Sequence, residues 1–185
     1  MPVLKSSEVP KTPTRGMTFR LPSDTVNQLR KVSEARNVST NTLFNQIITA
    51  FLDWHSMASD AKLYYLPKLF LIRLINELTE KELDELAWET AKNDVVDISL
   101  FLKGGFTIAS MSDIVETWLK IAQMPYRFEI TGESCKIIIE HDMGSKYSHL
   151  IKGISRYLLE VAFDTKSLCD VTDNAVIIKV ELSRM

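Results

Sequence analysis

The chain has 185 residues, of which 45% are hydrophobic and 25% charged, a composition near the globular average that excludes a disordered chain, a collagen-like repeat and a disulfide-stapled mini-scaffold. The formal net charge of −2 is unevenly spread, since residues 1–56 carry seven Lys or Arg against four acidic residues, or +3, and the remainder carries −5. A small basic head therefore precedes a larger acidic body, and the charge favours nucleic-acid binding for the head alone.

The hydropathy pattern indicates a protein outside the membrane. A spanning helix needs about 18 apolar residues, and the longest apolar runs here, such as Leu69 to Ile72, have roughly four. The first 16 residues have no apolar core of the kind found in secretory leaders. We therefore expect a cytoplasmic protein, and we expect its two cysteines, Cys135 and Cys169, to be reduced.

The chain begins with a segment that has no apolar periodicity. Residues 1–14 contain Pro2, Pro10 and Pro13 among Ser, Thr and Lys, which predicts a flexible basic arm. Residues 17–21 then alternate strictly between apolar and polar side chains, the pattern of a half-buried strand, and Pro22 ends it.

Two helices are predicted to follow the strand. Ser23 or Asp24 is a candidate N-cap for the first, in which apolar residues recur at three-residue spacing from Val26 to Ala35. Asn37 is a candidate left-handed terminator. Ser39 is the N-cap candidate for a second helix with a wide apolar face. The predicted unit over residues 15–58 is strand, helix, turn, helix.

The middle of the chain, residues 59–124, is predicted to be helical. One apolar pattern runs from Leu63 to Leu78, with a kink expected at Pro67. A second helix is predicted to start at Thr79. A third apolar segment runs over residues 95–102 and ends at Gly104-Gly105, and a fourth segment is predicted to start with Ser112 as its cap.

The apolar period changes after Pro125. Two hairpin patterns, around residues 131–134 and 172–174, flank an amphipathic helix capped by Ser145. Residues 125–185 are therefore predicted to form a ββαββ module. The fold class expected for the whole chain is α+β, with an N-terminal dimerisation unit, a helical middle segment and this C-terminal module.

The predicted N-terminal strand needs a partner, because an isolated five-residue strand is unstable in water. Pairing with the same strand of a second chain would give a two-stranded antiparallel ribbon, with the helices of both chains burying Met17, Phe19 and Leu21. Its other side would present Thr18 and Arg20 twice. Such a ribbon fits the DNA major groove, where Arg pairs with guanine and Thr contacts several base edges.

The ordered string from Arg15 to Pro22, the first helix, the turn Asn37 to Asn41 and the second helix resemble the ribbon-helix-helix DNA-binding family. The resemblance covers about a quarter of the chain. It implies a homodimer on double-stranded DNA. The residues it implies as base contacts are Gly16, Thr18 and Arg20, and those at the DNA backbone are Lys11, Arg15, Ser39, Thr40 and Asn41. The amides at the start of the second helix would hold a phosphate, since a helix N-terminus suits an anion.

Gly16 departs from the family pattern because it offers no side chain, so base reading would rest on Thr18 and Arg20 with help from Arg15. Two other interpretations of the segment stay open. Residues 17–21 could be an ordinary edge strand with solvated polar side chains. Alternatively, the unit could serve to dimerise the chain, and family members in toxin–antitoxin pairs both dimerise and bind DNA.

The body offers weaker candidates for a site. His141, His149, Cys135 and Cys169 lie near one another in sequence, and nickel-responsive ribbon-helix-helix regulators use His and Cys ligands in a C-terminal domain. However, the chain has no closely spaced ligand pair and a different order of elements, so we expect no metal and no cofactor. The string from His141 to Ser148 also resembles a segment of uncharacterised archaeal proteins, which assigns no chemistry.

No phosphate-binding loop, nucleophile elbow or zinc-protease motif is present in the sequence, so an enzyme is not expected. The sequence favours a site-specific DNA-binding transcription regulator whose body serves oligomerisation or sensing. The alternatives are an antitoxin-like or scaffold protein whose body binds a protein partner, and a regulator that responds to a metal or small ligand.

Overall fold

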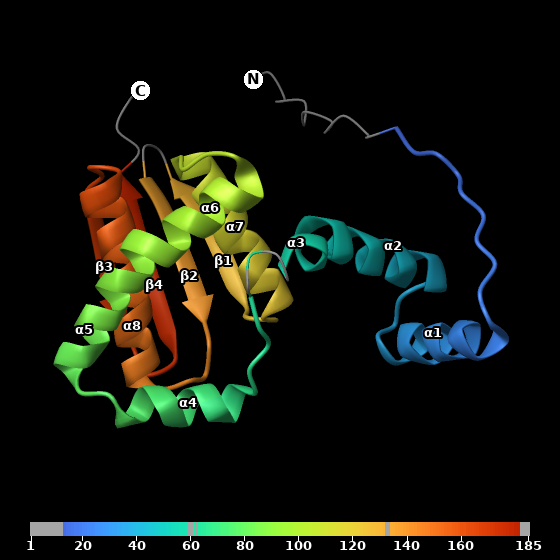
Figure 1. The fold of residues 1–185 in the computed structure, drawn as a ribbon, viewed down its shortest axis with the longest axis horizontal. Coiled ribbons are helices and arrows are strands. Elements are labelled where there is room, and N and C mark those ends of the chain that lie inside the picture. Colours follow the sequence, from blue (N-terminus) through green and yellow to red (C-terminus); the bar gives the residue numbers. More distant parts are fainter. Residues whose placement is uncertain (1–12, 59–60, 62, 132–133, 182–185) are drawn as a thin grey trace, which may run out of the picture. The chain divides into compact units, whose positions relative to one another are not determined.

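The structure is a computed structural model and describes residues 13–58, 61, 63–131 and 134–181 (Figure 1). The chain divides into two compact units between Ile47 and Ile48.

The first unit consists of an extended segment followed by two helices, α1 (Ser23–Ala35) and α2 (Thr40–Ala50). Pro22 stands at the N-cap of α1 and no side chain caps this end, so the predicted cap by Ser23 or Asp24 is wrong. The turn between the helices is as predicted. Asn37 adopts a left-handed backbone with φ of 53°, and Ser39 caps α2 by accepting a hydrogen bond from the Thr42 amide at 3.0 Å.

The predicted N-terminal ribbon is not present, so the fold-class prediction is wrong at this end. Residues 13–22 contain no strand. Alternation of apolar and polar side chains indicates that an extended segment has one apolar and one polar face. A strand also needs hydrogen bonds from a neighbouring strand. All four strands of the described chain lie between Tyr126 and Glu181, so residues 17–21 have no strand beside them within the first unit.

The second unit begins at Ile48, inside α2, and the helix continues beyond Ala50. A π-helical turn η1 (Phe51–His55) and α3 (Ser56–Ala58) complete this helix. The next helix is α4 (Lys68–Glu77), which starts after Pro67. The kink predicted at Pro67 is therefore wrong: the residue before a proline is disfavoured in helical geometry, whereas the ring suits the start of a helix.

Three helical segments follow in one continuous run: α5 (Glu80–Glu89), the π-helical η2 (Thr90–Val95) and α6 (Val96–Lys103). Thr79 and Glu82 form a capping box at the start of α5, and Gly104 ends α6 with φ of 68°. Helix α7 (Ile108–Ile121) starts with a capping box between Thr107 and Ser110. The cap predicted at Ser112 is therefore wrong by more than one turn.

The C-terminal part has the predicted ββαββ order: β1 (Tyr126–Thr131), β2 (Ser134–Glu140), α8 (Ser145–Arg156) with the π-helical η3 (Tyr157–Ala162), β3 (Ser167–Val171) and β4 (Ala175–Glu181). The strands form an antiparallel sheet in the order β1-β2-β4-β3. Gly144, with φ of 89°, takes the N-cap position of α8 that was predicted for Ser145.

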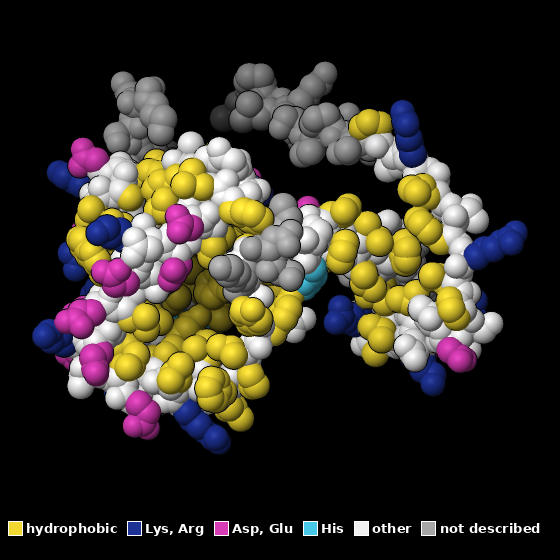
Figure 2. Space-filling view, in the orientation of Figure 1, with side chains coloured by type: hydrophobic (Ala, Val, Ile, Leu, Met, Phe, Trp, Pro, Cys, Tyr) yellow, Lys and Arg dark blue, Asp and Glu magenta, His cyan; other side chains and the backbone are white. Residues whose placement is uncertain are grey.

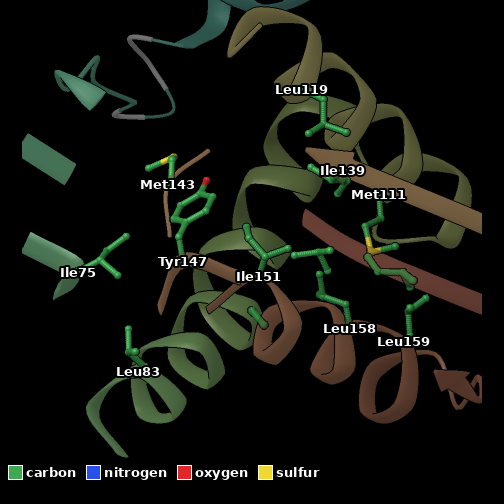
Figure 3. Packing of buried hydrophobic residues seen from close by; sticks show 13 residues of the cluster. Ile75, Leu83, Met111, Leu119, Ile139, Met143, Tyr147, Ile151, Leu158 and Leu159 are labelled. Atoms are coloured by element: carbon green, nitrogen blue, oxygen red, sulfur yellow. The ribbon is translucent and has the colours of Figure 1, made fainter. Parts of the chain in front are cut away.

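One core joins the helices of the middle segment to this sheet. Figure 3 shows Ile75, Leu83 and Ile151, from α4, α5 and α8, pointing toward a common interior. Ile139 and Ile178 of the sheet belong to the same buried cluster, as do residues of α7. The register sets Lys136 of β2 beside Glu129 of β1 and Lys179 of β4. Their side chains belong to the opposite, solvent-facing side of the sheet, because successive residues of a strand alternate.

No single helix of the described chain is long and apolar enough to cross a membrane.

Candidate nucleic-acid interface

The extended segment before α1 is exposed over its whole described length. Every residue from Pro13 to Pro22 is exposed, including Arg15, Thr18 and Arg20. The segment is held to the helices by Phe19, whose ring centre lies 5.4 Å from that of Phe44 in α2. It thus offers two guanidinium groups and a hydroxyl to an outside partner. Lys11 lies outside the described residues.

Gly16 sits in open space, since a Cβ added there would meet nothing within 4 Å. The glycine is therefore not required by packing. It also has no left-handed backbone angle. The segment can consequently accept a side chain at this position without rearrangement.

The N-terminus of α2 carries the other residues that the family resemblance implies. Ser39 accepts the Thr42 amide, and its hydroxyl also lies 2.7 Å from that of Thr42. The hydroxyl of Thr40 lies 3.2 Å from that of Ser33. Among described residues, no acceptor is present for the backbone amides of Thr40 and Asn41. An anion placed here would meet two N–H groups at the positive end of the helix dipole.

Ser33 is a contributor that the sequence analysis missed. Its side chain is buried, donates to the Arg30 carbonyl at 2.9 Å and contacts Thr40. It therefore ties α1 to the first residue of α2 and fixes the turn that presents Asn41. The sequence did contain a signal for its burial. Ser33 follows Leu29 by four residues and so lies on the same side of α1 as the apolar stripe.

The cations of this unit have no acidic partner within the described residues. No ion pair of the described chain includes Arg15, Arg20 or Arg30, nor Lys31 or Arg36. In the second unit, by contrast, Lys136 pairs with Glu129 at 2.9 Å and Lys179 with Asp170 at 3.2 Å. The described part of the first unit, residues 13–47, therefore carries positive charge that no ion pair within it neutralises.

The first unit is also apolar on its surface. Leu43 is the one large hydrophobic side chain buried within its described residues. Met17 is 78% exposed and Ile47 46% exposed, and the stripe of α1 is at best half-buried. A unit of this size with so small a core is unstable by itself and must bury its apolar face against another molecule or element.

The imidazole of His141 is buried and hydrogen-bonded within the protein. Its Nδ1 accepts from the Met143 amide at 3.1 Å, and its Nε2 lies 2.8 Å from the Ser148 hydroxyl, which donates to the Thr172 carbonyl at 2.6 Å. Both ring nitrogens are thus used, and burial lowers the pKa of His141. Ser148 is completely buried, so this Ser–His pair is closed to a substrate.

The four weak metal candidates are not brought together. His149 bonds Asp84 of α5 at 2.7 Å, whereas His141 bonds Ser148. Cys135 and Cys169 lie on different strands and in different rows, opposite Val180 and Ile178 of β4 respectively. Burial raises the pKa of Cys169 to about 11, so its thiol is protonated at neutral pH. No group of three metal-ligating side chains occurs in the described chain.

A scan against protein-family models finds no family that matches this chain, and a search of curated proteins finds no significant relative.

Proposed function

We propose that the chain is a sequence-specific regulator that binds double-stranded DNA as a homodimer through its first unit. The observation that carries the proposal is the exposed extended segment with Arg15, Thr18 and Arg20, beside a helix N-terminus whose first amides have no described acceptor. Arg is the side chain best suited to guanine in the major groove. Amides at a helix N-terminus suit a phosphate. The two features supply a base contact and a backbone contact from one small unit.

The dimer is supported by the apolar surface of the same unit. Ile47 of α2 is 46% exposed and Val32 of α1 43% exposed, in a unit whose described residues bury one large hydrophobic side chain, Leu43. A second copy would supply the missing core with no further component. Two copies related by a two-fold axis would read two half-sites of a pseudo-palindrome.

The test is selection of bound duplexes from a random pool, together with the solution mass of the protein. We expect a pseudo-palindromic motif and a mass of at least a dimer. Arg20→Ala should weaken binding to the selected site by about 1–3 kcal/mol and relax the preference at one position of each half-site. Lys31→Ala, an exposed cation of α1, is the matched control and should leave the preference unchanged.

Two results would contradict the proposal: no enriched motif, or wild-type affinity and sequence preference in Arg20→Ala. Ile47→Glu tests the dimer separately, because it places a charge in the apolar face and leaves the extended segment intact. We expect this variant to have a lower affinity for a palindromic site and nearly the wild-type affinity for a single half-site.

A second candidate function is a scaffold, or an antitoxin-like protein, whose body holds a protein partner. Leu100 and Phe101 of α6 favour it, since they are 50% and 53% exposed next to each other. Its expected signature is a stoichiometric partner that co-purifies with the chain and is released by Phe101→Glu. Weak DNA binding by the isolated chain would accompany it.

A further inference from the structure

Helix α4 is apolar on both of its sides. Its inner side carries Leu71, Ile72 and Ile75, which belong to or pack against the core, and Ile75 is only 3% exposed. Its outer side carries Leu69, Phe70 and Leu74, which are 68%, 53% and 50% exposed. A surface helix normally has one apolar stripe, and a helix that is apolar all round is normally buried. The outer side of α4 therefore has no cover among the described residues of the second unit.

The apolar surface extends to the residues before the helix. Tyr64, Tyr65 and Leu66 are 85%, 68% and 56% exposed. We call these three residues, with Leu69, Phe70 and Leu74, the α4 patch; Figure 2 shows hydrophobic side chains gathered over α4. A fully exposed aromatic residue presents about 200 Å², so the patch offers on the order of 700 Å². One partner of a standard specific interface contributes about 800 Å².

The charges on the same side of α4 are arranged for self-pairing. Arg73 and Glu77 are both exposed and lie between Leu69 on one side and Phe70 and Leu74 on the other, by helical geometry. Neither belongs to an ion pair among described residues, whereas Lys68 is held by Asp142. The outer side thus has one cation and one anion in axial order and no net charge.

A two-fold axis between two copies of α4 would place opposite charges of the two chains next to each other. If two copies of α4 pack antiparallel with the axis near Leu74, Arg73 of each chain faces Glu77 of the other. The helix dipoles then also oppose each other favourably. A parallel arrangement would instead set like charges side by side. An isologous contact of this kind needs the same patch on both partners, which a single chain type supplies.

We propose that the α4 patch is a self-association surface on which a second copy of this chain packs, with the two α4 helices antiparallel. The contact is separate from the one proposed for the first unit. Together the two contacts would join dimers into a tetramer, or close one dimer at both units. In either case two or more copies of the first unit are joined in one assembly.

The first test measures the solution mass of the full chain in four forms: wild type, Leu69→Glu, Ile47→Glu and the double variant. In the Ile47→Glu background, which removes the first-unit contact, we expect a dimer, and the double variant should be a monomer. Leu168→Glu is the matched control, because Leu168 is a sheet residue of nearly the same exposure, 69%. It should leave the mass unchanged. Circular dichroism checks that each variant is folded.

The outcomes separate this proposal from the proposed function. If Ile47→Glu is already a monomer and Leu69→Glu leaves the wild-type mass unchanged, the α4 contact is wrong and the first-unit dimer stands. If Ile47→Glu has no effect on mass or DNA affinity but Leu69→Glu halves the mass, the α4 contact stands and the first-unit dimer is wrong. If a different protein occupies the patch and the pure chain does not self-associate through it, Leu69→Glu has no effect on mass, which overturns the proposal.

The second test uses charge reversal to show that the pairing is between chains. In the Ile47→Glu background, Arg73→Glu and Glu77→Arg should each weaken self-association by about tenfold, because two like-charged contacts replace two favourable ones. Mixing the two variants should restore a heterodimer. One chain then carries glutamate at both positions and the other carries arginine at both, so each of the two contacts joins opposite charges. No restoration on mixing would contradict the antiparallel arrangement.

Discussion

Gly153 of α8 lies against Ala87 of α5 so closely that a Cβ on Gly153 would stand 2.6 Å from the Cβ of Ala87. Ala87 itself is buried. Both are Cβ atoms, whose positions are fixed by the helix backbone that carries them, so no rotamer change can relieve the overlap. The pair sets the distance at which α5 and α8 pack.

Gly153→Ala should therefore destabilise the chain. In an exposed helix the same change stabilises by about 0.5–1 kcal/mol, but overpacking a closed contact costs typically 1–3 kcal/mol. We expect a net loss in the free energy of unfolding, measured by urea denaturation. Adding Ala87→Gly should recover part of the loss by reopening the contact. Gly105→Ala, where nothing lies within 4 Å, is the control and should not destabilise.

His141 should make the stability of the second unit depend on pH. Burial lowers its folded-state pKa below the ordinary value of 6.5, so the unfolded chain binds the proton more tightly than the folded chain does. Stability is thus full above pH 6.5 and falls as the pH drops through this value, until the folded-state pKa is reached. The slope is at most about 1.4 kcal/mol per pH unit for one proton. A proton on Nδ1 would also face the Met143 amide, which now donates to that atom.

The measurement is urea unfolding at several pH values between 5 and 8. His141→Gln should flatten the curve in this range, since its amide can replace one donor and one acceptor without titrating. His149→Gln is the matched control and should leave the contribution of His141 in place. An unchanged slope in His141→Gln would show that other groups cause the dependence.

Local signals in the sequence predict those parts of the fold that adjacent residues determine. Asn37 and Ser39 mark the turn between α1 and α2, because a left-handed residue and an N-cap act within one helical turn. The change of apolar period after Pro125 predicts the ββαββ order. The apolar pattern around Pro67 suggests a kink, although the proline ring and the restriction on Leu66 make it a start signal.

Features that depend on distant residues could not be predicted in this way. The alternation in residues 17–21 predicts an extended backbone with two different faces, but it cannot supply a neighbouring strand. Nor does local periodicity show that Leu83 of α5 and Ile178 of β4 share one core. The spacing of His141 argues against a ligand role, but its bond to Ser148 depends on the path of the chain between β2 and α8.

Ser39 should separate the stability of the first unit from its affinity for DNA. Ser39→Ala removes the acceptor of the Thr42 amide, which should cost about 1 kcal/mol of helix stability. Ser39→Asp keeps an acceptor there, so the helix should stay capped. Its carboxylate, however, would stand where we propose a DNA phosphate. We expect Ser39→Asp to weaken DNA binding more than Ser39→Ala does, and equal effects on affinity would argue against a phosphate at this helix end.

Arg15 should contribute to DNA affinity without regard to sequence. It is exposed and belongs to no ion pair among the described residues. Each phosphate contact that is lost reduces the slope of log affinity against log salt by about 0.9. We therefore expect Arg15→Ala to lower the affinity for selected and for random duplexes by the same factor. The slope of log affinity against log salt should become shallower by about 0.9. A loss confined to the selected site would instead assign Arg15 to a base.

At Gly16, the DNA-binding proposal can be tested by adding a side chain that could contact a base, rather than by removing one. The open space around it allows Gly16→Ser without a clash, so the free energy of unfolding should stay within about 0.5 kcal/mol of wild type, as for surface substitutions generally. If position 16 faces base edges beside Thr18 and Arg20, the new hydroxyl adds a donor and acceptor at one base pair of each half-site. Repeating the selection with Gly16→Ser should then return a motif changed at that base pair and unchanged elsewhere. An identical motif would place residue 16 away from the bases.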